Sequence, residues 1–176
     1  DAQSTKNIDE PNAFSLSTIG KDDFPKSRIV LLKSFDSKGF VFFTNYNSSK
    51  GKDIVNNPKV CISFFWPFFE RQIIIKGIAS KLKNKISDKY FDSRPIGSRL
   101  GAMVSNQSEV IKNRKILDEK LEHLKNIYKT TQPKRPDNWG GYVVSPISYE
   151  FWQGRPNRLH DRIIFNKSND NWSINR

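Results

Sequence analysis

The sequence predicts a mainly β protein with added helices (α+β), arranged as an antiparallel barrel. Short segments rich in β-branched and aromatic residues follow one another along the chain, with turn residues between them. Helical patterns come late and do not alternate with strands, which argues against a doubly wound parallel sheet. The length of 176 residues suits one compact domain, which we expect to span residues 1–176.

The strands are predicted from these short apolar segments. Residues 28–33 form a β-branched and aliphatic run with a cation at each end, which is typical of a short strand buried on both faces. We expect this strand to form a hairpin with residues 40–44, across a turn at 36–39. The predicted strands are 13–19, 28–33, 40–44, 59–66, 72–79, 141–145, 149–152, 162–166 and 172–174.

Helices are predicted where caps and breakers frame the sequence. Ser48 or Ser49 can cap a helix that ends before Pro58. A break at Arg94-Pro95 separates two short helices, because proline is tolerated in the first turn of a new helix. The clearest helix carries its apolar residues on one stripe. The predicted helices are 48–55, 83–91, 95–104 and 110–128.

Composition restricts the classes of function. The formal net charge is +12, but no segment is a purely basic tail, which argues against a disordered nucleic-acid-binding arm. The basic surface either attracts anions or only aids solubility. The single Cys61 excludes an intrachain disulfide and a multi-cysteine zinc site, and no apolar run approaches the roughly 18–20 residues of a membrane span. We therefore expect a soluble, cytoplasmic protein with no membrane partner.

Two candidate anion sites lie in the first third of the chain. Arg28 and Lys33 are five residues apart and point to opposite faces of one strand by strict alternation, so they are either solvated or bind two different anions. Ser48, Ser49 and Lys50 at a helix N-terminus bring N–H groups, hydroxyls and an ammonium together, which suits a phosphate. Serine is also an ordinary N-cap residue, so this signal is weak by itself.

A glutamine and a polar triplet give two further candidates. Gln72 enters an apolar strand, where its amide must bond either to the backbone or to the edge of a heterocycle such as a flavin or a base. Tyr90, Arg94 and Ser98 are four residues apart in turn, and they either form a phosphate clamp or are placed by chance. His123 lies on the charged face of the long helix, and we expect it to be solvated.

The densest cluster of functional side chains lies near the C-terminus, in residues 150–154 and 158–162. If the second stretch is a strand, Arg158, His160 and Arg162 share one face and repel one another unless an anion neutralises them. With two histidines and one cysteine in the chain, we expect no transition-metal site.

Taken together, these stretches resemble the pyridoxine (pyridoxamine) 5′-phosphate oxidase family of FMN enzymes. Their order and spacing cover nearly the whole chain, and the last two stretches are the most diagnostic. The matching segments are 28–33, 43–45, 70–72, 90–95, 105–108, 139–141, 150–154 and 158–162.

The resemblance implies a split β-barrel homodimer with FMN at the subunit interface. It implies oxidation of pyridoxamine 5′-phosphate and pyridoxine 5′-phosphate to pyridoxal 5′-phosphate, with O₂ reduced to H₂O₂, in vitamin B6 biosynthesis or salvage. The implied FMN contacts are Arg28, Ile29, Val30, Leu31, Leu32, Lys33, Phe43, Thr44, Ser49, Lys50, Gln72, Gln107, Ser108, Trp152 and Arg162. The implied substrate contacts are Lys33, Tyr90, Arg94, Ser98, Arg158, Leu159 and His160, with Arg158 and His160 as the catalytic residues.

The chain departs from the family pattern at one site residue and at its ends. Ser49 stands where the family usually has arginine, which removes one charge-assisted contact to the FMN phosphate and predicts weaker cofactor binding. We also expect the family's longer N-terminal extension and its short C-terminal tail to be absent.

Three other functions remain open on the sequence. A phenazine-type oxidase of the same fold would not need the clamp of Tyr90, Arg94 and Ser98. A non-catalytic flavin- or haem-binding barrel would not need Arg158 and His160. A nucleic-acid-binding barrel would place its basic residues along one groove, and the distribution of charge along the chain gives no sign of that.

Overall fold

The computed structural model describes residues 2–169 and 171–176. The strands are β1 (Ala13–Ile19), β2 (Pro25–Leu31), β3 (Ser34–Asp36), β4 (Gly39–Asn45), β5 (Lys59–Trp66), β6 (Arg71–Lys81), β7 (Trp139–Gln153), β8 (Asp161–Ser168) and β9 (Asn171–Asn175). The helices are α1 (Ser49–Asn56), α2 (Asn84–Asp92), α3 (Ile96–Val104) and α4 (Lys115–Ile127), with 3₁₀ turns η1 (Pro67–Phe69) and η2 (Pro156–Arg158).

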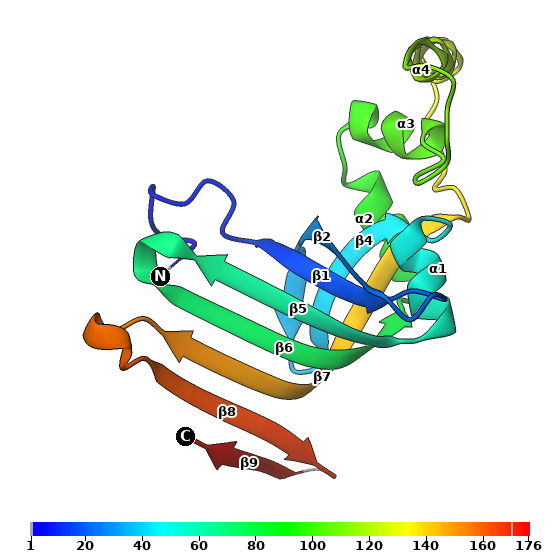
Figure 1. Cartoon of the computed structure of the whole chain (residues 1–176). Coiled ribbons are helices and arrows are strands. Elements are labelled where there is room, and N and C mark those ends of the chain that lie inside the picture. The colour runs from blue at the N-terminus through cyan, green and yellow to red at the C-terminus, as the bar shows by residue number, and fades with distance from the viewer. Residues whose placement is uncertain (1, 170) are drawn as a thin grey trace. The chain divides into compact units, whose positions relative to one another are not determined.

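These strands form one sheet in the order β2-β1-β5-β6-β7-β4-β3, with β8 paired to β7 and β9 paired to β8 (Figure 1). The pairings whose registers are described are all antiparallel. The predicted class, mainly β with added helices, is therefore confirmed. Among the described residues, none of the helices combines the length and the apolar character needed to cross a bilayer.

The chain divides into two compact units. Unit 1 comprises Asp1–Phe42, Asp53–Ser80 and Val143–Arg176. Unit 2 comprises Phe43–Lys52 and Lys81–Tyr142, and therefore contains α2, α3 and α4.

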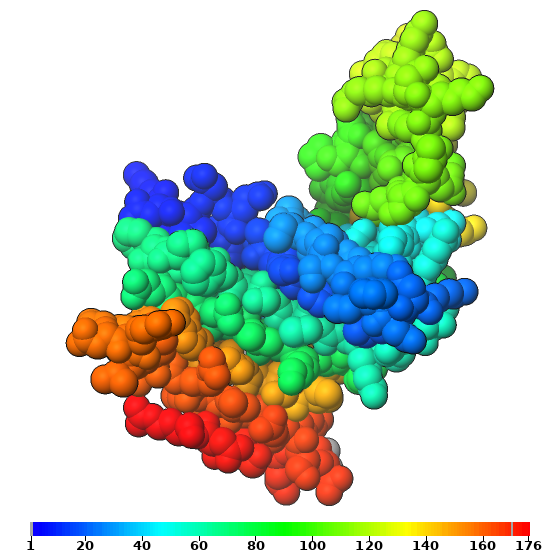
Figure 2. Space-filling model, viewed as in Figure 1, coloured from blue at the N-terminus to red at the C-terminus, as the bar shows by residue number. Residues whose placement is uncertain are grey.

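The core of unit 1 is built on alternating positions of its strands. In β1 every second residue is buried, which places Phe14, Leu16 and Thr18 on one face of the sheet. The Phe14 ring packs against Phe64 of β5 at 5.3 Å and against Phe42 of β4 at 6.1 Å between ring centroids. By contrast, β8 and β9 lie at the surface, where they are drawn in orange and red in Figure 2.

The pairing of the first strands differs from the prediction. The strand that starts at Pro25 pairs along its whole length with β1, and β3 rather than β2 forms the hairpin with β4. The reason is a short turn after β1, closed by a hydrogen bond from Gly20 N–H to Phe24 O at 3.0 Å, which brings β2 directly back onto its neighbour in sequence. In the β3–β4 turn, Gly39 has φ +137°, a conformation that glycine adopts without strain.

The prediction that residues 28–33 form a strand buried on both faces is also wrong. β2 lies at one end of the sheet order, and Ile29 is 69% exposed. The strand ends at Leu31, so Lys33 lies outside it and strict alternation from Arg28 does not apply. The aliphatic run at residues 28–33, with a cation at each end, is therefore not a strand buried on both faces.

Several predicted bounds need correction in the second half of the chain. One strand of 15 residues, β7, replaces the two predicted at 141–145 and 149–152, and it runs through Pro146. A proline removes one ladder donor without necessarily ending a strand. The long helix begins at Lys115 rather than at residue 110. His123 is exposed on this helix, as predicted.

The protein is expected to lose stability at alkaline pH because of Tyr142 in unit 2. Its side chain is 1% exposed and packs edge-to-face on Tyr46 at 5.4 Å between ring centroids. Burial, together with the nearby Tyr46, raises the pKa of Tyr142 from 10.0 to about 12. The contribution of the neutral phenol to stability is therefore fully present below pH 10.0 and is lost as the pH rises toward about 12.

The measurement is the free energy of unfolding in urea at a series of pH values, for the wild type and for Tyr142→Phe. We expect the wild type to lose stability relative to the variant across this interval. Two curves that stay parallel would contradict the assignment.

Candidate active site

Lys50 lies buried at the start of α1 among oxygen atoms of unit 2. Its Nζ is 3.2 Å from Thr44 Oγ1, 3.4 Å from Ser48 Oγ and 3.3 Å from Gln107 Oε1. The Lys50 residue is 8% exposed and Thr44 is 7% exposed. The structure thus brings together three predicted phosphate and flavin contacts, Thr44, Lys50 and Gln107. An ammonium held in place by hydroxyl and amide oxygens suits an anion such as phosphate.

The N-terminus of α1 is capped by Ser48 rather than by Ser49. Ser48 Oγ accepts the Gly51 N–H at 3.3 Å, as an N-cap side chain does three residues into a helix. The Ser49 N–H donates to Ser108 Oγ at 3.2 Å, and Ser108 adopts a left-handed φ of 71°. Two further predicted phosphate contacts, Ser49 and Ser108, therefore lie next to each other.

In unit 1, the Arg28 guanidinium is held by a buried acid. Its Nη1 donates to Thr18 Oγ1 at 2.7 Å and to Leu16 O at 3.2 Å, and its Nη2 is 3.7 Å from Asp53 Oδ2. The Thr18 hydroxyl donates to the same Asp53 Oδ2 at 2.7 Å. Burial lowers the pKa of Arg28, and the charge of Asp53 opposes this shift. Arg28 is therefore neither a freely solvated strand-end cation nor an unpaired one.

Asp53→Asn is expected to lower the free energy of unfolding by about 1.5–3 kcal/mol, the usual range for hydrogen bonds to a charged group. Asp53 is 5% exposed, so water cannot replace the lost carboxylate oxygen. Chemical unfolding of the purified protein measures the effect. The matched control is Asp22→Asn, which makes the same charge change in an exposed ion pair with Lys26 at 3.1 Å. Equal losses in the two variants would contradict the prediction.

Three nearly parallel rings in unit 2 carry part of the predicted substrate clamp. Phe43 stacks on Tyr90 at 3.8 Å and 19°, and on Trp139 at 5.5 Å and 16°. The Arg94 Cζ lies 4.7 Å from the centroid of the Trp139 ring. Tyr90 is in α2 and Ser98 is in α3, with Arg94 in the connection between them, so the predicted break is confirmed.

Two guanidinium nitrogens of unit 2 are buried without a hydrogen-bond partner among the described residues. Among the described residues, neither Arg94 Nη1 nor Arg99 Nε has a hydrogen-bond partner. Burial lowers the pKa of Arg94, while the neighbouring Tyr90 opposes the shift. An unpaired buried donor is unfavourable, so this arrangement fits a site that an anion completes.

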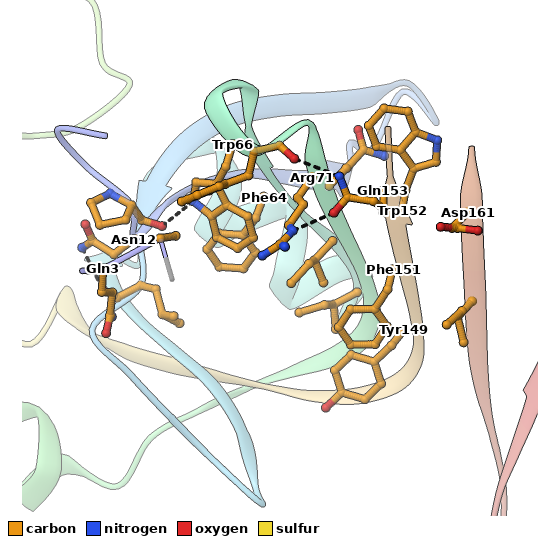
Figure 3. A pocket seen from close by; sticks show the side chains of 18 of the residues that line it. Gln3, Asn12, Phe64, Trp66, Arg71, Tyr149, Phe151, Trp152, Gln153 and Asp161 are labelled. Atoms are coloured by element: carbon orange, nitrogen blue, oxygen red, sulfur yellow. Dashed lines mark hydrogen bonds between the residues drawn. The ribbon is translucent and has the colours of Figure 1, made fainter. Parts of the chain in front are cut away.

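A cavity of about 840 Å³ in unit 1 is lined mainly by apolar side chains, among them the rings of Phe64, Trp66, Phe151 and Trp152 (Figure 3). Gln72 lines the same cavity. An apolar cavity of several hundred Å³ with a few polar groups is typical of a small-molecule site.

One wall of this cavity is fixed by Gln153. Its Oε1 accepts the Arg71 Nε–H at 2.7 Å (Figure 3). Its Nε2 donates to Phe69 O at 3.0 Å and to Gly154 O at 3.3 Å. The Gly154 N–H also donates to Glu70 O at 2.7 Å. The end of β7 is thereby tied to the turn that precedes β6. The sequence carried a signal for this contact, because both partners lie in the matching stretches 70–72 and 150–154.

The segment before β8 places the two predicted catalytic residues outside any strand. Arg158 ends η2 with φ 62°, after Asn157 with φ 59°. The His160 Nδ1 accepts the Arg155 N–H at 3.1 Å, and its ring lies 4.8 Å from the Trp152 ring. The condition under which Arg158, His160 and Arg162 would share one strand face is therefore not met, because the left-handed residues turn the chain before β8 begins at Asp161.

Carboxylates pair with several cations of the C-terminal region. Arg162 Nε is 3.1 Å from Glu150 Oε1, so this cation is balanced within unit 1. Asp161 binds Arg155 at 2.7 Å and Arg176 at 3.2 Å, and hydrogen bonds from these two arginines lower the pKa of Asp161. The described residues hold no cluster of three or more side chains suited to a metal ion.

The remaining predicted contacts are dispersed. Ile29, Val30 and Leu31 lie in β2, and Leu32 lines the cavity of unit 1. Lys33, Leu159 and Ser98 are exposed. Sequence reasoning identified neither Asp53 nor Arg135, because their partners lie far away in the sequence. Arg135 binds Asp88 at 2.7 Å.

Comparison with known proteins adds two family matches. Residues 1–128 match the profile of the family described as pyridoxamine 5′-phosphate oxidase. Residues 139–176 match the region described as the pyridoxine 5′-phosphate oxidase C-terminal dimerisation region.

Curated relatives carry the same description. The chain is 55% identical over 175 residues to the pyridoxine/pyridoxamine 5′-phosphate oxidase of Christiangramia forsetii, covering 99% of this chain and 82% of that protein. It is 60% identical over 168 residues to the enzyme of that name from Flavobacterium johnsoniae, covering 95% and 78%.

Solved structures support the predicted split-barrel fold. PhzG from Burkholderia lata, in complex with tetrahydrophenazine-1-carboxylic acid, is similar with a TM-score of 0.91 and 27% identity, over 96% of this chain and 83% of that chain. An FMN-binding protein from Nostoc punctiforme, related to pyridoxamine 5′-phosphate oxidase, has a TM-score of 0.77 and 14% identity, over 97% and 89%. At that identity the second likeness concerns the fold alone.

Proposed function

The chain belongs to the pyridoxamine 5′-phosphate oxidase family, and on that premise we propose that it oxidises pyridoxine 5′-phosphate and pyridoxamine 5′-phosphate to pyridoxal 5′-phosphate with bound FMN. The observation that carries the proposal is the presence of two separate cationic sites in unit 2. One is Lys50 among its oxygen partners, and the other is Arg94 with its unpartnered Nη1. One site suits the phosphate of the cofactor and the other the phosphate of the substrate.

The residues present fit FMN. Lys50, Thr44, Gln107 and Ser108 of unit 2 offer an ammonium, hydroxyls and an amide for its phosphate. The apolar cavity and the amide of Gln72 in its lining suit a flat heterocycle with polar edges. Phe43, Trp152 and Arg162 would contact the flavin. FMN supplies, when bound, a two-electron acceptor that O₂ reoxidises with formation of H₂O₂.

The chain's own residues bind and orient the substrate. Arg94, Tyr90, Ser98 and Lys33 would hold the substrate phosphate, and binding at this remote group is used to place the reacting carbon. Arg158 would orient the substrate and polarise its reacting group. His160, which is fixed by the Arg155 N–H and the Trp152 ring, would position the pyridine ring. The aromatic walls of the cavity would exclude water from the reaction.

The C-terminal match supports a homodimer, and we place FMN at its interface by analogy with the family. Ser49, whose N–H binds Ser108, cannot supply the guanidinium of the usual arginine, which predicts weaker FMN binding. That residues 1–176 act as one domain, in a reducing cytoplasmic compartment, remains the prediction made from chain length and the single Cys61.

A phenazine-type oxidation is the second candidate, because PhzG is similar over 96% of this chain. The Arg94 site favours a phosphorylated substrate, and the identity to the curated oxidases, 55% and 60%, exceeds the 27% to PhzG. Both substrate classes therefore belong in the same assay.

The test is an absorbance spectrum of the purified protein, followed by addition of pyridoxine 5′-phosphate in air. We expect flavin bands, and the appearance of H₂O₂ and pyridoxal 5′-phosphate. Flavin bands with turnover of tetrahydrophenazine-1-carboxylic acid only would favour the second candidate. A colourless protein that does not bind added FMN would overturn the proposal.

A further inference from the structure

Trp139 lies in the matching stretch 139–141, outside the FMN and substrate contacts that the resemblance implies. It is 7% exposed and is the first residue of β7, in unit 2. Its ring is nearly parallel to the Tyr90 ring, at 5° and 6.2 Å, and the Arg94 Cζ lies 4.7 Å from its centroid. Trp139 is therefore a side chain on which two members of the proposed phosphate clamp, Tyr90 and Arg94, both pack.

Among the described contacts, packing on the Trp139 ring is what orients the Arg94 guanidinium. The guanidinium forms no salt bridge within residues 2–169 and 171–176, and its Nη1 is buried without a hydrogen-bond partner. The connection between α2 and α3 fixes only its backbone, through the Arg94 N–H to Phe91 O at 3.1 Å. An indole face attracts a guanidinium and leaves its in-plane N–H groups available for an anion.

A buried arginine fixes the position of Trp139 in turn. The Arg135 side chain is 7% exposed, and its Nη1 donates to Trp139 O at 2.5 Å. Its Nε binds Asp88 Oδ1 at 2.7 Å, and its Nη2 donates to Asn84 Oδ1 at 3.3 Å. Both partners lie in α2, the helix that carries Tyr90. One guanidinium thus ties the start of β7 to that helix.

We propose that Trp139 is a positioning residue for the substrate phosphate, and that Arg135 holds Trp139 in this place. The inference rests on the proposed function. It adds residues that hold the phosphate-binding side chains in place without touching the phosphate. The indole fixes the plane of the Arg94 guanidinium, so the phosphate meets donors that are already oriented. Loss of the ring leaves the cation in place but frees its orientation, which weakens binding of the phosphate group alone.

The experiment compares FMN-loaded wild type, Trp139→Leu and Trp139→Phe. It measures KM and kcat for pyridoxine 5′-phosphate, and the affinities for pyridoxal 5′-phosphate and for pyridoxal, which lacks the phosphate. For Trp139→Leu we expect about a tenfold rise in KM and about a tenfold loss of pyridoxal 5′-phosphate affinity, as loss of a desolvated cation–π contact predicts. Pyridoxal affinity and FMN affinity should not change. Trp139→Phe, which keeps an aromatic face, should recover most of the loss.

The matched control is Val104→Ala, a buried truncation in α3 of the same unit. It should lower the melting temperature and leave the ratio of the two ligand affinities at the wild-type value. If Trp139→Leu weakens pyridoxal as much as pyridoxal 5′-phosphate, or changes neither, the inference is overturned.

Arg135→Lys provides a second route if Trp139→Leu does not fold. It keeps a cation beside Asp88 but loses the planar fork that reaches Trp139 O. A wild-type affinity ratio in this variant would overturn the inference. A wild type that binds no FMN or does not oxidise the substrate would instead overturn the proposed function.

Discussion

Replacing Arg158 with alanine is expected to lower kcat/KM for pyridoxine 5′-phosphate by about 10²–10³-fold, the usual cost of removing a group that stabilises charge at the reacting atoms. FMN affinity should be almost unchanged. No described residue forms an ion pair with Arg158, so the substitution breaks no salt bridge among the described residues. The Arg158 φ of 62°, directly after Asn157 at 59°, is a conformation that non-glycine residues rarely adopt. Such backbone strain is often found at functional sites.

The measurement is steady-state oxidation, together with titration of FMN into the apoprotein. Arg114→Ala serves as the matched control, because it removes an exposed arginine whose only described ion pair, with Asp118, is a surface contact at 3.8 Å. Equal losses of turnover and of FMN affinity in Arg158→Ala would contradict the assignment to substrate. The kcat/KM of Arg158→Lys should fall between those of the wild type and Arg158→Ala, because lysine keeps the charge but not the planar donors.

Lys50→Met is expected to raise the dissociation constant of FMN by about 30-fold or more, as truncating one partner of a buried charged pair usually does. The Lys50 ammonium is buried, and its oxygen partners Thr44, Ser48 and Gln107 hold it within 3.4 Å. Methionine has a similar length and fills the same space without donating a hydrogen bond. Quenching of FMN fluorescence during titration of the apoprotein measures the affinity.

The control for this variant is Lys52→Met, two residues further along α1. Lys52 is exposed, so the change removes the same charge from the same helix without touching the buried oxygens. We expect its FMN affinity to match the wild type. Equal weakening by both variants would mean that general attraction to a basic surface, rather than a built site, binds the phosphate. The melting temperature of each apoprotein separates loss of folding from loss of binding.

The strands that were predicted correctly have clear local boundaries. β1 and β5 begin and end where expected, because Gly20 follows the first and Pro67 follows the second. The order of strand pairing could not be predicted from composition. The short turn after β1 pairs β2 with β1, and this leaves β3 to form the hairpin with β4. A run of β-branched residues is found both in a central strand and in a strand at the sheet edge.

The candidate site was predicted only where the sequence itself concentrates functional residues. The N-terminus of α1 and the break at Arg94 could be inferred locally, from caps and proline. The partners that orient these groups could not, because Thr18 and Asp53 or Asp88 and Arg135 are joined by folding rather than by spacing. A single sequence does not show whether an aspartate is buried or solvated. Only the three-dimensional contacts distinguish the two cases.

The hydrogen bonds of Gln153 restrict which amino acids this position can accept. One oxygen receives the Arg71 Nε–H, while the amide nitrogen donates to Phe69 O and Gly154 O. A glutamate could accept from Arg71 but could not donate to either carbonyl, and a lysine could donate but not accept. An asparagine has both functions on a side chain one methylene shorter. The choice of residue at position 153 is therefore set by the number of donors and acceptors and by the length of the side chain. A protein designer who changed Arg71 would have to redesign this whole turn.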